Sequence, residues 1–163
     1  RLLSLLSGSD EEVRGYMQKL SETGTYTVSD RVLRAVQAEF SCGFCTDAQG
    51  AQTIGKTFRE NHYLLDTHTA VACTVLDAYR AGTGDQTLTV VESTASPFKF
   101  CASVLDALGV TEHAPGTGVL GQLTAETGRP APKPLASLAG KPVRFDQVTD
   151  RGDMRAVVTE FLR

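Results

Sequence analysis

The chain has 163 residues, of which 41% are hydrophobic and 21% charged, and its net charge is −3. A globular domain of this length buries roughly two-thirds of its unfolded surface. The sequence lacks the clustered Lys and Arg of a nucleic-acid surface and the run of about 20 apolar residues of a membrane span. The Leu-rich start is too short for a signal peptide. We therefore expect a cytoplasmic protein without nucleic-acid or membrane partners.

Apolar spacing predicts a mostly helical chain. The first residues already read as helical, and Ser9 is expected to cap the next helix, with Val13, Met17 and Leu20 as its apolar stripe. A following helix is expected to turn Val32, Leu33, Val36 and Phe40 inward. The expected helices run from Ser9 to Gly24, Asp30 to Phe40, Asp47 to Asn61, Thr67 to Ala81, Phe98 to Gly109, Leu120 to Thr127 and Asp153 to Leu162. Residues 129–134, with three prolines, are expected to be an extended link.

One β-branched run, residues 88–93, is predicted to be a strand. Hydroxyl side chains and Pro97 follow it before the next helix begins. Strand, polar turn and helix is the layout that places ligand-binding groups at the carboxyl end of a strand in an α/β sheet. A lone strand leaves its backbone groups unpaired, so we expect its sheet to lie in another part of a longer protein.

Three further features have plainer explanations. Residues 116–121 match the spacing G-x-G-x-x-G, but no strand precedes them, so we expect ordinary loop glycines. Cys42 and Cys45 form a C-x-x-C without a second close pair, which favours reduced, partly buried thiols over a metal or redox site. His68 lies at a predicted helix N-terminus, where it either faces a ligand or packs beside a cap made by Asp66 or Thr67.

Four blocks in order resemble the C-terminal part of threonine synthase. Residues 93–100, STASPFKF, resemble that family's S-T-A-H-P-A-K-F segment, and residues 63–72 resemble its D-P-H-T-A-V segment. Residues 1–8 and 142–162 resemble flanking parts of the family. The resemblance implies that residues 1–163 are one C-terminal segment of a pyridoxal-phosphate (PLP) enzyme. Its fold class would be α/β, a tryptophan-synthase-β-like large domain (fold type II) with few strands in this part.

The resemblance also implies a reaction and site residues. Threonine synthase converts O-phospho-L-homoserine and water into L-threonine and phosphate. By position in the motif, Thr94 is the first candidate, and Ser93 the second, for contact with the cofactor's pyridine nitrogen. Lys99, Ser96 and His68 are candidates for substrate binding. This chain departs from the family where Ser96 replaces His, Phe98 replaces Ala and Thr67 replaces Pro.

No catalytic residue is assigned within this chain. The family's Schiff-base lysine and its glycine-rich phosphate cradle lie earlier in the protein, and no lysine here sits in a matching motif. We therefore expect the chain alone to be inactive, with PLP bound by the longer protein. Its expected partners are the missing N-terminal part and, through exposed apolar faces, a second copy. The alternatives are a non-catalytic helical binding or regulatory module, or another fold-type-II enzyme such as threonine dehydratase.

Overall fold

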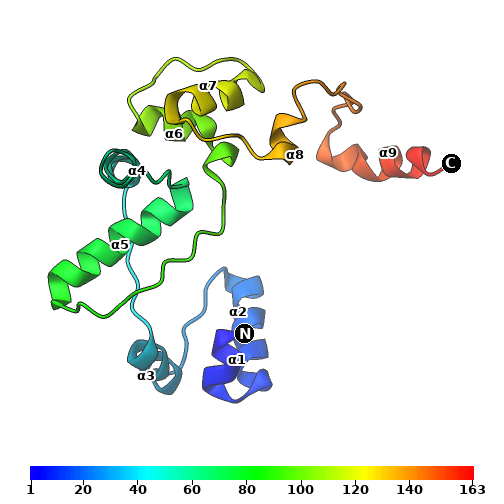
Figure 1. Ribbon diagram of the computed structural model, residues 1–163. Coiled ribbons are helices and arrows are strands. Elements are labelled where there is room, and N and C mark those ends of the chain that lie inside the picture. The colour runs from blue at the N-terminus through cyan, green and yellow to red at the C-terminus, as the bar shows by residue number, and fades with distance from the viewer. The chain divides into compact units, whose positions relative to one another are not determined.

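Helices make up all of the regular secondary structure in the computed structural model, which describes residues 1–163 (Figure 1). Two of the longer helices begin at polar caps. The Ser9 hydroxyl accepts a hydrogen bond from the backbone N–H of Glu12 at 3.1 Å, and Thr46 exchanges hydrogen bonds with Gln49 in a capping box. These caps satisfy N–H groups that a first helical turn leaves without a partner. The helices are α1 (Leu2–Ser7), α2 (Asp10–Thr23), α3 (Asp30–Glu39), α4 (Asp47–Asn61), α5 (Thr67–Thr83), α6 (Cys101–Ala107), α7 (Gly118–Thr127), α8 (Lys133–Ala136) and α9 (Met154–Phe161), with 3-10 turns η1 (Pro97–Lys99) and η2 (Arg151–Asp153).

The predicted helices all form, with ends displaced by a few residues. The segment expected to be one helix from Phe98 divides into η1 and α6, because Phe100 has a non-helical backbone with φ −130° and ψ 39°. Helix α5 continues to Thr83, past the expected end at Ala81. Helix α8 was not predicted, and it forms inside the proline-rich link because Pro134 suits the first turn of a helix.

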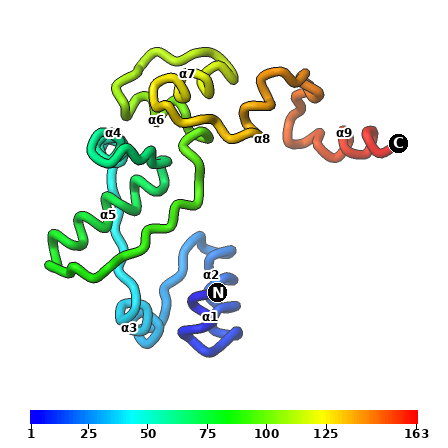
Figure 2. Tube along the Cα trace, viewed as in Figure 1, coloured from blue at the N-terminus to red at the C-terminus, as the bar shows by residue number.

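The predicted strand at residues 88–93 is wrong. These residues are extended, as Figure 2 shows, but they pair with no other strand. Leu88 and Val90 are 93% and 85% exposed. A β-branched run adopts a strand only where a neighbouring strand and a packed face are available, and this chain supplies neither. The chain is therefore mostly helical, as expected for this part of the protein, and the few strands expected with the α/β class are absent from it.

Contacts between Cα atoms divide the chain into two compact units. Unit 1 comprises residues 1–45 and 75–87, and unit 2 comprises residues 46–74 and 88–163. In unit 1, α1 packs against α2 and α3. The Tyr16 ring is buried and stacks on Tyr26 with centroids 5.4 Å apart, and its hydroxyl donates a hydrogen bond to Glu12. Arg31 pairs with Glu12 at 3.0 Å and donates to the backbone carbonyl of Ser7, which joins the three helices.

The apolar stripes predicted in unit 1 are only partly correct. Met17 and Leu20 are each 42% exposed, and the buried residue of α2 is Tyr16. In α3, Val32 is fully buried, whereas Leu33 and Phe40 are exposed. The short helices of unit 1 bury a single residue each along α2 and α3, because three small elements do not cover a whole helical stripe.

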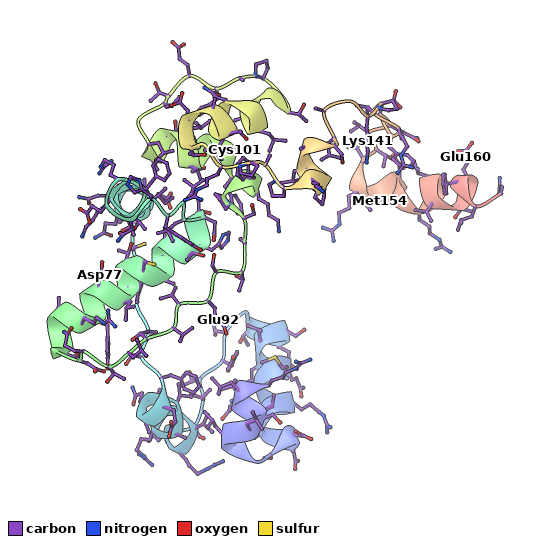
Figure 3. All side chains as sticks on the ribbon, viewed as in Figure 1. Asp77, Glu92, Cys101, Lys141, Met154 and Glu160 are labelled. Carbon is purple, nitrogen blue, oxygen red and sulfur yellow. The ribbon has the colours of Figure 1, made fainter.

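Unit 2 contains the main apolar core. Helix α6 lies at its centre and packs against both α4 and α7, and Figure 3 marks the buried Cys101 at the start of α6. Arg129 donates a hydrogen bond to the backbone carbonyl of His62 at 2.6 Å, which fastens the segment after α7 to the end of α4. The core residues are Ile54, Leu65, Ala70, Phe98, Cys101, Val104, Leu105 and Leu123.

No helix of this chain combines the length and the apolar character that crossing a membrane requires.

Helix α4 approaches α6 most closely at Gly55, and we expect a side chain there to destabilise unit 2. A Cβ atom at residue 55 would lie 2.6 Å from the backbone oxygen of Ala107. Gly55→Ala should therefore lower the free energy of unfolding by about 1–3 kcal/mol, as overpacked cores do. Gly121→Ala is the matched control, because a Cβ at residue 121 in α7 meets nothing within 4 Å.

The control substitution should be neutral or raise stability by up to about 1 kcal/mol, since alanine is the better helix former. Urea unfolding followed by circular dichroism measures both variants. Equal effects of the two substitutions would contradict the close approach of α4 and α6.

Candidate functional site

The first turn of α5 is held by Asp66, the residue directly before the helix. Its Oδ1 atom accepts hydrogen bonds from the backbone N–H groups of His68 at 2.8 Å and Thr69 at 3.1 Å. Aspartate is among the best residues for this capping position, since its carboxylate oxygen satisfies the free N–H groups of the first turn. The preceding Leu65 is buried in the core of unit 2 and fixes Asp66 at the surface of that core. The structure therefore confirms that Asp66 caps this helix.

The second carboxylate oxygen of Asp66 reaches a distant part of the chain. Oδ2 accepts a hydrogen bond from the Thr69 hydroxyl and another, at 3.3 Å, from the hydroxyl of Ser93. The hydroxyls of Thr69 and Ser93 also lie 3.1 Å apart. Asp66 and Thr69 are 1% and 4% exposed. Asp66 and Thr69 are buried and Ser93 lies at the exposed edge, so the three side chains form a polar cluster that joins the start of α5 to the turn after residue 92.

The Asp66 carboxyl remains ionised in this cluster. Burial opposes the charge and would raise the pKa, but the hydrogen bonds from Thr69, His68 and Ser93 favour the charged form and together hold the pKa below its ordinary value. A buried carboxylate without such donors would be costly. The carboxylate therefore stays charged only while these donors remain in place. In return, its charge stabilises the first turn of α5 and the position of Ser93.

His68 contacts the C-terminal end of the turn at residues 93–100. Its side chain is 68% exposed, and its ring lies against Phe100 with centroids 5.1 Å apart. One helical turn therefore touches Ser93 through Asp66 and Phe100 through His68. Residues 94–99 form the stretch between these two attachment points.

The remaining predicted residues lie on that stretch. Thr94 is exposed, and its hydroxyl has no hydrogen-bond partner within the chain. Ser96 begins η1, where its hydroxyl accepts a hydrogen bond from the backbone N–H of Phe98 at 3.3 Å. Lys99 is exposed and lines a shallow hollow of about 350 Å³ between η1, α6 and the start of α7, together with Gly116 and Thr117. The hollow belongs to unit 2, and Lys99 is not in contact with the Asp66 cluster.

Sequence reasoning placed Ser93 and His68 in the site but gave Asp66 only a capping role. Asp66 also bridges to Ser93, and Thr69 was not singled out at all. The available signal was the run Asp66-Thr67-His68-Thr69 at a helix start, which indicates a cap. A bridge to a hydroxyl 27 residues later leaves no mark in the local sequence.

The other motifs occupy ordinary positions. Gly116 lies in a loop and Gly118 begins α7, and the residues before them form no strand, so the G-x-G-x-x-G spacing is a loop and a helix start as expected. Cys42 and Cys45 are free thiols. Cys45 is half-buried as expected, but Cys42 is exposed because residues 40–46 form an irregular segment. No group of three or more His, Cys, Asp or Glu side chains is placed to hold a metal ion.

Comparison with known proteins identifies the family. The sequence profile described as "Threonine synthase, C-terminal" matches residues 69–159, which is more than half of the chain and includes the 93–100 turn. The chain belongs to this family. The match confirms the resemblance to threonine synthase and includes the block at residues 93–100 and most of the block at residues 142–162.

Threonine synthases are also similar over much of the chain. PLP-bound threonine synthase from Brucella melitensis, a solved structure, is 32% identical with a TM-score of 0.56, covering 79% of this chain and 26% of that one. Threonine synthase of Saccharomyces cerevisiae is 28% identical over 113 residues, 64% of this chain and 22% of the relative. The Schizosaccharomyces pombe enzyme is 32% identical over 101 residues, 61% of this chain and 20% of the relative. Threonine synthase-like 1 of Homo sapiens is 27% identical over 114 residues, 69% of this chain and 15% of the relative.

The chain thus spans about a quarter or less of the length of these relatives. The match to the Brucella structure is consistent with a helical fragment of that protein's fold.

Acid should remove the stabilisation that ionised Asp66 provides. Because the folded state holds this pKa below the value of the unfolded chain, about 4, the contribution is complete above that value and is lost as the pH falls through the folded pKa. Asp66→Asn should lower the free energy of unfolding by about 2 kcal/mol at neutral pH, as expected for hydrogen bonds to a charged group. As the pH falls through the folded pKa of Asp66, the difference between the two proteins should shrink toward zero.

Urea unfolding of both proteins across this pH range measures the effect. A difference that stays constant down to the lowest pH would show that the carboxylate charge contributes nothing to the cluster.

Proposed function

We propose that this chain is the C-terminal part of a PLP-dependent threonine synthase, which converts O-phospho-L-homoserine and water into L-threonine and phosphate. Membership of the family supports this reaction, and the PLP-bound relative supports the cofactor. The observation that carries the proposal is the turn at residues 93–100, which matches the family profile and displays a hydroxyl with no partner in the chain. The longer protein would have the tryptophan-synthase-β-like fold (fold type II) and act in the cytoplasm.

The two candidate hydroxyls differ in their fitness for the cofactor. The Ser93 proton is directed into the cluster with Asp66 and Thr69, so it is not available to an outside group. Thr94 is exposed with an unengaged hydroxyl, and it can donate a hydrogen bond to a ring nitrogen. Thr94 therefore fits the cofactor contact, and Ser93 fits the support of that contact. When bound, PLP supplies the electron sink for the substrate's carbon chemistry.

Three side chains suit the phosphorylated substrate. The Lys99 ammonium is exposed at the rim of the hollow near α7, where a phosphate could meet it as a point charge. The Ser96 hydroxyl accepts from Phe98 but keeps its own proton for a substrate oxygen. The exposed His68 ring lies beside Phe100, the last residue of the 93–100 turn. We propose these three as substrate contacts of the assembled site.

The lysine that holds PLP covalently belongs to another part of the protein. A lysine with that task is usually desolvated, which makes its amine reactive. Every lysine of this chain is exposed and outside a matching motif. They are Lys19, Lys56, Lys99, Lys133 and Lys141.

Two apolar surfaces of the chain support an N-terminal partner segment. The extended residues 88–91 carry the exposed apolar side chains of Leu88 and Val90, and a β-branched segment of this kind suits addition to a sheet as a strand. Helix α9 exposes Val158 and Phe161, with Met154 at its start marked in Figure 3. We propose that the earlier part of the same protein covers both surfaces. Pairing of two copies of the chain is the competing outcome.

The isolated chain should be inactive. Mixed with PLP, it should show no absorbance band of lysine-bound cofactor and release no phosphate from O-phosphohomoserine, because no lysine of the chain is suited to hold the cofactor. Absorbance titration and a phosphate assay measure the two. Turnover by the isolated chain would contradict the division of tasks proposed here.

In the longest protein that carries this sequence, Thr94→Ala should lower kcat about 10- to 100-fold, since a positioned hydrogen bond to a reacting group is lost. Thr111→Ala is the matched control, because Thr111 is also an exposed threonine of unit 2. Cys42→Ala is a second control at an exposed position of unit 1. Both controls should keep kcat within about twofold. Equal losses for Thr94→Ala and the controls would remove Thr94 from the site.

A further inference from the structure

Asp66 does more than a helix cap requires. A cap needs one oxygen, and Oδ1 supplies it by accepting from the N–H groups of His68 and Thr69. The caps at Ser9 and Thr46 likewise use one side-chain oxygen each. Oδ2 of Asp66 takes no part in the cap, yet it is fully buried and accepts hydrogen bonds from the hydroxyls of Thr69 and Ser93. The second oxygen therefore serves the turn at residue 93.

Only a carboxylate can fill both tasks. At Oδ2 it faces two hydroxyl donors, and an ionised carboxylate is acceptor-only at both oxygens. An asparagine keeps one acceptor and places an amino group, which is a donor, at the second position. Asp66→Asn therefore preserves the cap through Oδ1 and opposes the bridge at Oδ2, because Asn caps helices about as well as Asp.

The bridge acts directly beside the proposed cofactor contact. Thr94 follows Ser93 in the chain, and its own side chain makes no hydrogen bond that would fix it. The nearest attachments are Ser93 on one side and, four residues further, Phe98, which is buried in the core of unit 2. Release of Ser93 would leave Thr94 joined on its N-terminal side to the extended segment 88–92, in which Leu88 and Val90 are 93% and 85% exposed.

We propose that Asp66 is a positioning residue, whose second carboxylate oxygen anchors Ser93 and thereby sets where Thr94 presents its hydroxyl. The role of Thr94 rests on the function proposed above, whereas the anchoring of Ser93 does not. The two can therefore be tested apart.

The anchor is tested in the chain itself by a double-mutant cycle. Ser93→Ala should lower the folding equilibrium constant about tenfold in the unsubstituted chain, the typical worth of a hydrogen bond to a charged group. In the Asp66→Asn background the same change should cost less than threefold, because the bridge is already lost. Ser137→Ala is the control, since the exposed Ser137 hydroxyl donates to the backbone carbonyl of Pro134 at 3.1 Å, far from Asp66 in sequence. Its cost should be the same in both backgrounds.

Equal costs of Ser93→Ala in both backgrounds would overturn the anchor. If Asp66→Asn does not fold, Asp66→Ser takes its place in the cycle, because serine also caps helices well but has no second oxygen to accept from Ser93. Additive costs with that variant would overturn the anchor as well.

The positioning role is tested in the longest protein that carries this sequence. Ser93→Ala and Asp66→Asn should each lower kcat about tenfold and leave KM within threefold, and the double variant should be no worse than either alone. Both should shift the PLP absorption band in the direction that Thr94→Ala shifts it, and Ser93→Thr should restore kcat and the band. The positioning role would be overturned if Ser93 and Asp66 are coupled in the stability cycle but their substitution leaves kcat and the PLP absorption band of the enzyme unchanged. If Thr94→Ala leaves kcat unchanged while Ser93 and Asp66 are still coupled, the proposed function is overturned and the anchor is not.

Discussion

A buried carboxylate with four hydrogen-bond donors organises the candidate site. Asp66 brings a charge into a place that water cannot reach, and that charge is tolerated only while the backbone of α5, Thr69 and Ser93 surround it. The requirement works in both directions. The donors keep the carboxyl ionised, and the carboxylate keeps two segments of the chain together. The apolar core beneath, through Leu65, fixes the position of the whole cluster.

The proposed division of the site between this chain and another part of the protein rests on what the chain exposes. Thr94, Ser96 and Lys99 present polar groups from a turn that is held at both ends, whereas the lysines carry no sign of a covalent role. On its N-terminal side the same turn is preceded by the extended segment at residues 88–91. The proposed ligand contacts and the proposed sheet edge therefore lie next to each other along the chain, as a pocket completed by a second segment would require.

Much of this fold could be predicted because helices are local. Caps such as Ser9 and Thr46, and apolar residues repeating every three or four positions, located the helices to within a few residues. The strand at 88–93 was predicted wrongly because β-branched residues favour a strand only when another strand is present. Tyr16 in place of Met17 as the buried residue of α2 could not be predicted, since it depends on neighbouring helices. The resemblance located Ser93 and His68, but the bridge through Asp66 is non-local, and only the three-dimensional arrangement reveals it.

The length of chain enclosed by that bridge has a kinetic consequence. Asp66 and Ser93 are 27 residues apart, so closing their contact costs more loop entropy than any helical turn. Helices α4 to α6 can form from neighbouring residues within microseconds, while this closure has to wait until they are in place. During folding, the turn carrying Thr94 is thus assembled after the helices. During unfolding, it opens before the apolar core under it. A site built in this way adjusts more readily to an arriving partner than the helices that carry it.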